Sequence, residues 1–183
     1  IVNPMELNDL EKLRFPVGKF SPPPQITKSD LEQWISELAD FPINIESLVG
    51  NLSEKQLEWT YRPGGWNIRQ VVHHCADSHM NSLIRFKLAL TEKTPVIKPY
   101  EEDLWAELPD YEAPITDSLD IIRGVHRRWV NLLKQMNEEQ FNKTFLHPAS
   151  NKIFTLKEAL ALYAWHSKHH LAHIKQALQF QGK

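Results

Sequence analysis

The stretch Thr155–Phe180 reads TLKEALALYAWHSKHHLAHIKQALQF and predicts one long helix, which sets the class of the fold. Thr155 and Glu158 have the spacing of a capping box, which marks a helix start. Successive residues of a helix are about 100° apart, so one face collects apolar side chains followed by histidines. The members of this face are Ala159, Leu162, Tyr163, His166, His170, His173, Ile174 and Ala177.

Four of the chain's nine histidines lie within residues 166–173. His166 and His170 are one turn apart near the centre of the predicted inward face, so both imidazoles can reach one metal ion. His169 falls on the flank of that face. Imidazoles directed into an apolar interior need either a metal or hydrogen-bond partners. The structural alternative is therefore that core hydrogen bonds, or solvent in a groove, satisfy these histidines.

Three further segments have helical periodicity and end signals. A capping-box pattern at Ser29 and Glu32 begins the first, in which Pro42 is expected to cause a kink or an end before the helix resumes. Asn67 caps the second, which runs to about Glu92. The third spans residues 117–136, and short turns are expected at 53–59 and 137–141. Together with residues 155–180, these segments predict an all-α four-helix bundle with long irregular connections.

The chain of 183 residues fits a single domain, which we place at residues 27–183. Residues 1–26 show no persistent period, and Pro16, Pro22, Pro23 and Pro24 favour an extended N-terminal arm. Residues 94–116 form a long loop, which in compact domains is often functional. A strand is suggested only at Lys152–Phe154.

Composition excludes several classes of function. The net charge of −2 and the lack of a basic block give no support to nucleic-acid binding. Apolar runs are too short for a membrane span, and no signal peptide is evident. Cys75 is the only cysteine, which rules out an intrachain disulfide and a thiolate metal cluster. A cytoplasmic location is expected.

Two histidines on one helix rarely complete a metal site, so a third ligand is expected from a neighbouring helix. The predicted second helix contains His73, His74 and His79. His74 lies on a polar stripe beside the apolar face, and His79 lies near the centre of that face. The helical wheel allows either His74 or His79. A buried histidine bonded to a carbonyl group is the default interpretation of His79.

Two motifs resemble those of the DinB-like superfamily, and in particular its YfiT branch. YRPGGWNIRQVVHHCADSHMN at residues 61–81 is similar to the first metal motif, and WHSKHHLAH at residues 165–173 is similar to the second. Segments 15–22, 98–105 and 147–148 also resemble this branch. The resemblance implies that the ligands are His74, which lies eight residues after Trp66, together with His166 and His170. Cys75 replaces a usually aliphatic residue and is interpreted as buried and inert.

The resemblance implies two enzymatic readings, a metal-dependent hydrolase and a transferase that uses a low-molecular-weight thiol such as bacillithiol. It also implies a homodimer and a small-molecule substrate. Three neutral imidazoles leave a coordination position of a divalent ion open, which is typical of catalytic sites. Zinc or nickel is the expected ion, one per chain. The non-enzymatic alternative is a metal-binding stress or interaction module in which a structural ion clamps two helices.

Several other polar residues are candidate parts of the site. His173, one turn beyond His170, is the candidate catalytic residue: it could orient a substrate, shuttle a proton or serve as a fourth ligand. Asp77 is interpreted as a surface carboxylate rather than a general base, and Tyr163 as a packing residue. Arg69 and Arg85 could anchor a carboxylate-bearing thiol. Thiol transfer is slightly favoured, because no obvious Asp or Glu base accompanies the ligand motifs.

Overall fold

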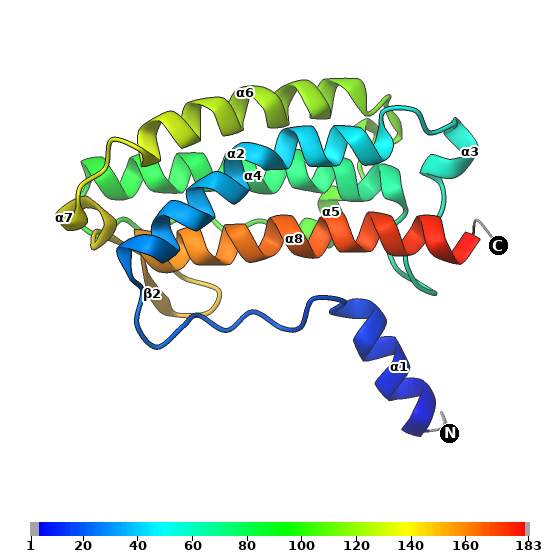
Figure 1. Cartoon of the computed structure of the whole chain (residues 1–183), viewed down its shortest axis with the longest axis horizontal. Coiled ribbons are helices and arrows are strands. Elements are labelled where there is room, and N and C mark those ends of the chain that lie inside the picture. Colours follow the sequence, from blue (N-terminus) through cyan, green and yellow to red (C-terminus); the bar gives the residue numbers. More distant parts are fainter. Residues whose placement is uncertain (1–3, 182–183) are drawn as a thin grey trace.

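Four long helices build the fold in the computed structural model, which describes residues 4–181. They are α2 (Lys28–Val49), α4 (Ile68–Thr91), α6 (Thr116–Leu133) and α8 (Leu156–Gln181). Helices α2 and α4 each pack against both α6 and α8 (Figure 1). The order around the bundle is therefore α2, α6, α4, α8, and the consecutive helices α2 and α4 lie diagonally. The predicted four-helix bundle is confirmed.

The predicted caps hold at the starts of α4 and α8. Thr155 Oγ1 accepts a hydrogen bond from the Glu158 backbone N–H at 3.2 Å, and Asn67 Oδ1 accepts one from Gln70 at 2.8 Å. Capping boxes also begin α3 (Glu54–Leu57) and α7 (Glu138–Phe141). Among the four long helices, α6 has no side-chain cap, because the residue before it is Ile115, whose side chain cannot accept a hydrogen bond.

Helix α2 differs from the prediction at its start and at Pro42. Thr27 and Asp30, rather than Ser29 and Glu32, form its capping box, with the Asp30 carboxylate accepting from the Thr27 N–H at 2.7 Å. Both pairs have the required spacing, so the pattern alone does not select between them. The helix continues through Pro42, and Figure 1 shows its two halves running at different inclinations.

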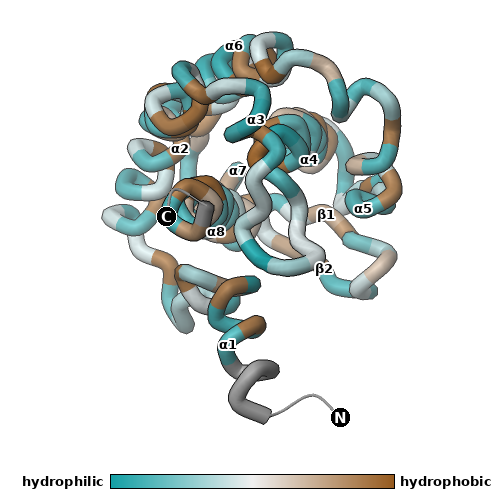
Figure 2. The backbone as a smooth tube through the Cα atoms, turned by 90° about the vertical axis from the view of Figure 1, so that its right-hand side faces the viewer, coloured by the Kyte–Doolittle hydropathy of each residue, from teal (hydrophilic) through white to brown (hydrophobic). Residues whose placement is uncertain are grey.

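The N-terminal region is wrongly predicted over part of its length. Instead of an extended arm throughout residues 1–26, the chain forms helix α1 (Pro4–Arg14) and becomes irregular only from Phe15 onward. The prolines that favour an extended chain begin at Pro16, after the helix has ended, and Pro4 occupies the first helical position that proline tolerates. Figure 2 shows α1 standing away from the bundle. Residues 1–3 lie outside the described part.

Two short strands form a hairpin between α7 and α8. Strand β1 (Thr144–His147) pairs antiparallel with β2 (Lys152–Thr155), and Phe145 stands opposite Phe154. The sequence suggested β2 but missed β1, because a strand of four residues shows too little alternation to be recognised. The long loop before α6 contains the short helix α5 (Glu102–Trp105) and the 3-10 helix η1 (Pro109–Glu112).

The core consists of two apolar clusters separated by histidines. One cluster contains Leu38, Phe86, Trp129 and Leu160, and the other contains Phe41, Val72, Ile122 and Ile174. Along α4, α6 and α8, the residues between the clusters include His79, His126, His166 and His170, which are all buried or nearly so. We call these four residues, together with His74 and His173, the histidine layer.

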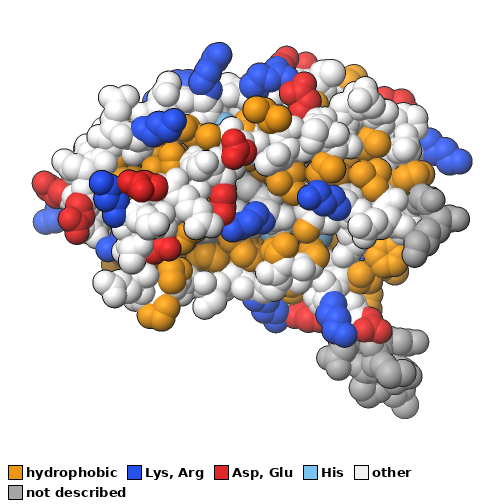
Figure 3. All heavy atoms as spheres, in the orientation of Figure 1, with side chains coloured by type: hydrophobic (Ala, Val, Ile, Leu, Met, Phe, Trp, Pro, Cys, Tyr) orange, Lys and Arg blue, Asp and Glu red, His pale blue; other side chains and the backbone are white. Residues whose placement is uncertain are grey.

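Lys and Arg side chains are interspersed with Asp and Glu on the face in Figure 3, in keeping with the small net charge. Within residues 4–181, none of the helices is both long enough and apolar enough to cross a membrane.

Candidate metal centre

The structure brings the three predicted ligands together. His74 on α4 and His166 and His170 on α8 offer ring nitrogens that all lie within 4.8 Å of one another. The Nε2 atom of His166 lies 3.2 Å from Nε2 of His74 and 3.1 Å from Nε2 of His170. His79, the alternative that the helical wheel allowed, contacts the opposite nitrogen of His166, at 3.0 Å from Nδ1. It therefore lies outside this convergence.

Local packing positions the three rings. His166 and His170 are one turn apart on α8, which packs directly against α4. The ring of Trp66, just before the Asn67 cap, lies 4.7 Å from the His74 ring, measured between centroids. The cap fixes where α4 begins, and hence which of its residues face α8.

Burial keeps these imidazoles neutral near pH 7. Loss of solvent lowers the pKa of His74 to about 4, with the nearby His169 adding to the effect. The pKa values of His166 and His170 also lie well below the usual 6.5, first because of burial and then because of neighbouring imidazoles. A neutral imidazole retains the nitrogen lone pair that metal coordination requires.

The hydrogen bonds around His170 assign its proton to Nδ1 and leave Nε2, the nitrogen that faces His166, unprotonated. The Arg14 carbonyl can only accept, so the His173 Nε2–H donates to it at 3.1 Å. Nδ1 of His173 then accepts from Nδ1–H of His170 at 3.4 Å, which leaves a lone pair on Nε2 of His170. That lone pair lies beside Nε2 of His166. Nitrogens about 3.4 Å apart are expected around a tetrahedral ion with bonds of about 2.0–2.1 Å, so the three residues fit a divalent cation.

The remaining histidines of the motif have separate environments. Both ring nitrogens of His173 contact protein groups, and its ring stacks on Tyr61. His169 is buried and stacks on Trp165 with ring centroids 4.4 Å apart. Neither residue belongs to the group of nitrogens that converges with His74.

Two of the polar candidates have the structural roles that the sequence favoured. Tyr163 is buried and donates a hydrogen bond from its hydroxyl to the Ser78 carbonyl at 3.2 Å. Cys75 is completely buried, and burial raises the pKa of its thiol, as expected for an inert cysteine.

The Asp77 carboxylate is half-buried and accepts a hydrogen bond from the Tyr111 hydroxyl at 2.7 Å.

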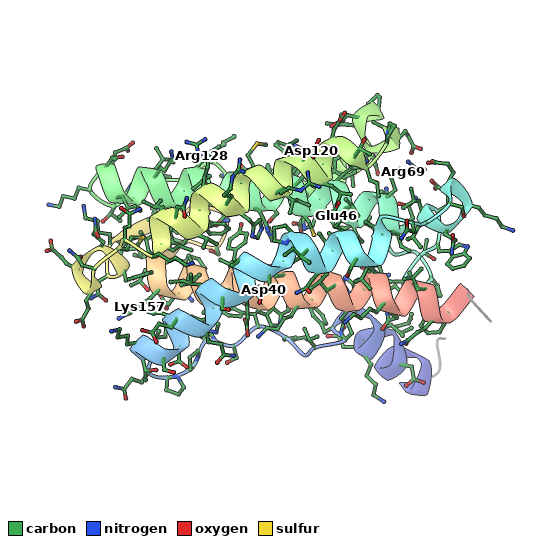
Figure 4. All side chains as sticks on the ribbon, turned by 45° about the horizontal axis from the view of Figure 1, so that its top comes forward. Asp40, Glu46, Arg69, Asp120, Arg128 and Lys157 are labelled. Atoms are coloured by element: carbon green, nitrogen blue, oxygen red, sulfur yellow. The ribbon has the colours of Figure 1, made fainter. Side chains whose placement is uncertain are left out.

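Arg69 is not available as a substrate anchor. Its side chain is buried and forms ion pairs with Glu54 and Glu58, at 2.5 and 3.0 Å. Figure 4 shows Arg69 at the end of the bundle next to α3, to which Glu54 belongs. The sequence could not reveal this role, because the partners precede Arg69 across an irregular turn.

A cavity of about 350 Å³ opens onto the three histidines. Besides the ligand set, its wall includes two cations, Arg14 and Arg62, and two carboxylates, Glu102 and Asp103. A second cavity, of about 430 Å³, reaches His166 from another side and is lined by Arg85, His147 and the same two carboxylates. Helix α5 therefore borders both cavities.

Glu102 and Asp103 were not recognised as site residues in the sequence. They lie on helix α5, which has only four residues and is too short for a helical period that would predict the direction of a side chain. The only signal was their presence in segment 98–105, which resembles the YfiT branch. The Glu102 side chain is exposed, but nearby protein atoms displace part of its water and so raise the pKa of its carboxyl, and the neighbouring Asp103 raises it further.

The fold and the site place this protein in the class of helical bundles in which histidines from two helices converge. Comparison with known proteins identifies its family. The chain belongs to the DinB superfamily, whose family model matches residues 37–174. It is 47% identical over 170 residues to a Bacillus pumilus (strain SAFR-032) protein named "Putative metal-dependent hydrolase", covering 93% of this chain and 97% of that protein. A Bacillus cereus (strain 03BB102) protein of the same name is 50% identical over 165 residues, covering 90% and 95%.

Two solved structures have the same fold. YfiT from Bacillus subtilis, described as "a probable metal-dependent hydrolase with an unusual four-helix bundle topology", superposes with a TM-score of 0.91 at 45% identity. The match covers 93% of this chain and 98% of YfiT. The mycothiol-dependent maleylpyruvate isomerase superposes with a TM-score of 0.57 at 18% identity, over 82% of this chain and 63% of the isomerase. This second likeness extends to the fold alone.

Proposed function

We propose that this chain is a metal-dependent hydrolase in which His74, His166 and His170 hold one zinc or nickel ion. A divalent ion bound by neutral imidazoles lowers the pKa of water toward neutrality and polarises a carbonyl group. The names of the relatives support hydrolysis as the reaction. The substrate is expected to be a small molecule that fits the cavity of about 350 Å³.

Glu102 is the proposed general base. The observation that carries the hydrolytic proposal is that this carboxylate and the three histidines line one cavity. A raised carboxyl pKa brings the base closer to the pH at which it must accept and return a proton. The sequence slightly favours thiol transfer because its ligand motifs contain no obvious carboxylate base, and the presence of Glu102 and Asp103 on the cavity wall removes that reason.

His173 is proposed to orient His170 rather than to carry protons. Both of its ring nitrogens are engaged, one with the Arg14 carbonyl and the other with His170. A proton shuttle would need one of these contacts to break in every cycle. A histidine whose second nitrogen is bonded in this way fixes the tautomer and direction of a ligand.

Thiol transfer is the second candidate, with a low-molecular-weight thiol as co-substrate. The observation that favours it is that Arg14 and Arg62 both line the cavity of the histidines. Guanidinium groups bind carboxylates in a bidentate manner, so the pair could hold an anionic thiol with its sulfur toward the ligand set.

A screen of substrates separates these functions. The protein would be loaded with zinc or nickel and supplied with ester and amide substrates, and in parallel with anionic thiols plus an electrophile. Turnover of esters or amides that is lost in the Glu102→Gln variant supports hydrolysis. Turnover only in the thiol set supports transfer, and turnover in neither set favours the non-enzymatic module. A homodimer remains a prediction from the family resemblance, and a cytoplasmic location remains a prediction from composition.

A further inference from the structure

A second chain of histidines lies on the side of His166 that faces away from the ligand set. The Leu38 carbonyl oxygen is 2.6 Å from Nδ1 of His126, and Nε2 of His126 is 2.6 Å from Nδ1 of His79. Nε2 of His79 is in turn 3.0 Å from Nδ1 of His166. Both intermediate histidines are essentially inaccessible to solvent, at 0% for His79 and 1% for His126. The four groups come from α2, α6, α4 and α8, which is one from each long helix.

The carbonyl at the end of this chain determines where every proton lies. Because the Leu38 oxygen can only accept, Nδ1 of His126 must carry a hydrogen. A neutral ring has one N–H, so Nε2 of His126 accepts from Nδ1–H of His79. By the same reasoning, Nε2 of His79 accepts from Nδ1–H of His166. The lone pair of His166 is then on Nε2, the atom that faces His74 and His170.

Hydrogen bonding, rather than a second metal ion, explains these contacts. Two nitrogens that bind one tetrahedral ion are expected about 3.4 Å apart, whereas the contact between His79 and His126 is 2.6 Å. The contacts also run in series from ring to ring and do not converge on one point. Aromatic packing confines the rings further, since Phe41 lies against both His79 and His126 with centroids 4.9 and 5.1 Å away.

We propose that His79 and His126 are positioning residues that hold His166 in its Nδ1–H tautomer, with Nε2 presented to a divalent cation. The proposal rests on the proposed metal site. It gives a function to a chain of buried polar groups that interrupts the core between the two apolar clusters. Loss of such an outer partner typically weakens metal affinity by about 10–100-fold.

Three substitutions on α6 test the role of His126. His126→Phe keeps a flat ring but removes the acceptor for His79. His126→Gln restores the chain, because its amide N–H₂ can donate to Leu38 while its carbonyl accepts from His79. Ile122→Ala is the control, since Ile122 is buried one turn away on the same helix and makes no polar side-chain contact. It lowers stability without touching the hydrogen-bonded chain.

Two measurements are made on each full-length protein. The dissociation constant for Co²⁺ is obtained by competition with a chelator, and ¹⁵N NMR of the metal-free protein reports which nitrogen of His166 carries the proton. We expect a weakening of Co²⁺ binding by about 10–100-fold and a mixed His166 tautomer in His126→Phe. Wild-type behaviour is expected for His126→Gln and Ile122→Ala.

The proposal is overturned if His166 in the wild-type metal-free protein carries its proton on Nε2. It is also overturned if His126→Phe binds Co²⁺ no more weakly than Ile122→Ala. Failure of the wild-type protein to bind Co²⁺ would instead overturn the metal site. The two failures are distinguishable, because NMR reads the tautomer without any metal.

Discussion

The imidazole of His173 lies flat against the phenol ring of Tyr61, with ring centroids 3.8 Å apart and ring planes 14° apart. The contact joins the loop before α4 to the last helix. It restricts the His173 ring to the plane in which its nitrogens meet the Arg14 carbonyl and His170. The direction of one proposed ligand thus depends on an aromatic residue that does not contact the cation.

Tyr61→Ala should lower both stability and metal affinity. Removing a buried aromatic ring costs about 3–5 kcal/mol of unfolding free energy, and His173 loses the surface that orients it. Tyr61→Phe is the matched control, because it keeps the stacked ring. Urea unfolding and Co²⁺ competition would measure the two effects. Equal Co²⁺ affinity in the Ala and Phe variants would contradict the proposed orientation of His170 through His173.

Single alanine substitutions of His74, His166 and His170 should each reduce the metal content of the purified protein. Every one of them removes a nitrogen from the converging set. His169→Ala is the control, since it removes a buried imidazole of the same helix whose ring packs on Trp165. Elemental analysis after dialysis gives the metal content, and circular dichroism confirms folding. A loss in His169→Ala as large as in the other variants would show that the ligand set is wrong.

Glu102→Gln should lower kcat for a hydrolytic substrate by about 10²–10⁴-fold, the usual contribution of a general base. Metal content should not change, because the carboxylate is not in the ligand set. Asp103→Asn, at the next position on the same cavity wall, provides the comparison. Steady-state kinetics would show the difference. A kcat that falls in Asp103→Asn but not in Glu102→Gln would transfer the role to the neighbouring carboxylate.

The metal-free protein should lose stability as the pH falls from about 6.5 toward about 4. Burial lowers the pKa values of His74, His126 and His169 to about 4 and that of His173 to about 3. In this window the unfolded chain binds protons that the folded protein does not, so acid favours unfolding. Each such histidine contributes a slope of up to about 1.4 kcal/mol per pH unit.

Urea unfolding at several pH values would measure this slope. In the His169→Ala variant, the slope of unfolding free energy against pH should be shallower by the contribution of one histidine. This variant serves as an internal check. Stability that stays constant between pH 6.5 and 4 would show that these imidazoles do not remain neutral in the folded protein.

Arg69→Met should destabilise the protein by about 1.5–3 kcal/mol, the range for hydrogen bonds to charged groups, without changing KM. Its guanidinium is engaged by Glu54 and Glu58 at the α3 end of the bundle. Arg62→Met is the opposite case, since Arg62 lines the cavity of the three histidines. We expect it to raise KM with a smaller loss of stability. Thermal unfolding and substrate titration of both variants distinguish an ion pair of the fold from a substrate contact.

The bundle could be predicted because its helices carry local signals. Apolar periodicity marked the four long segments, and pairs such as Asn67 with Gln70 marked where they begin. Strand β1 and helix α1 lack comparable signals. The strand is too short to show alternation, and the prolines beyond Arg14 obscured the helix before them. The two cap patterns at Thr27 and Ser29 have the same spacing, so spacing alone does not select the one at Thr27 that forms.

The ligand set was predictable, but the residues that support it were not. His166 and His170 share a helical face, and the family resemblance supplied His74. His126 lies one turn from Ile122 on the inward face of its helix, yet an isolated histidine gives no reason to expect a partner on another helix. The path from Leu38 to His166 joins residues far apart in the sequence. Glu102 could not be predicted for a different reason, because the four-residue helix α5 is too short to show a period.

The hydrogen bond between the Arg14 carbonyl and His173 joins positions 159 residues apart. Because the two partners are so far apart in the chain, the Arg14 segment can form this bond only when α8 is in place to offer His173. A truncation that removes the segment around Arg14 should therefore leave His173 without its carbonyl partner and the wall of the cavity beside His170 incomplete.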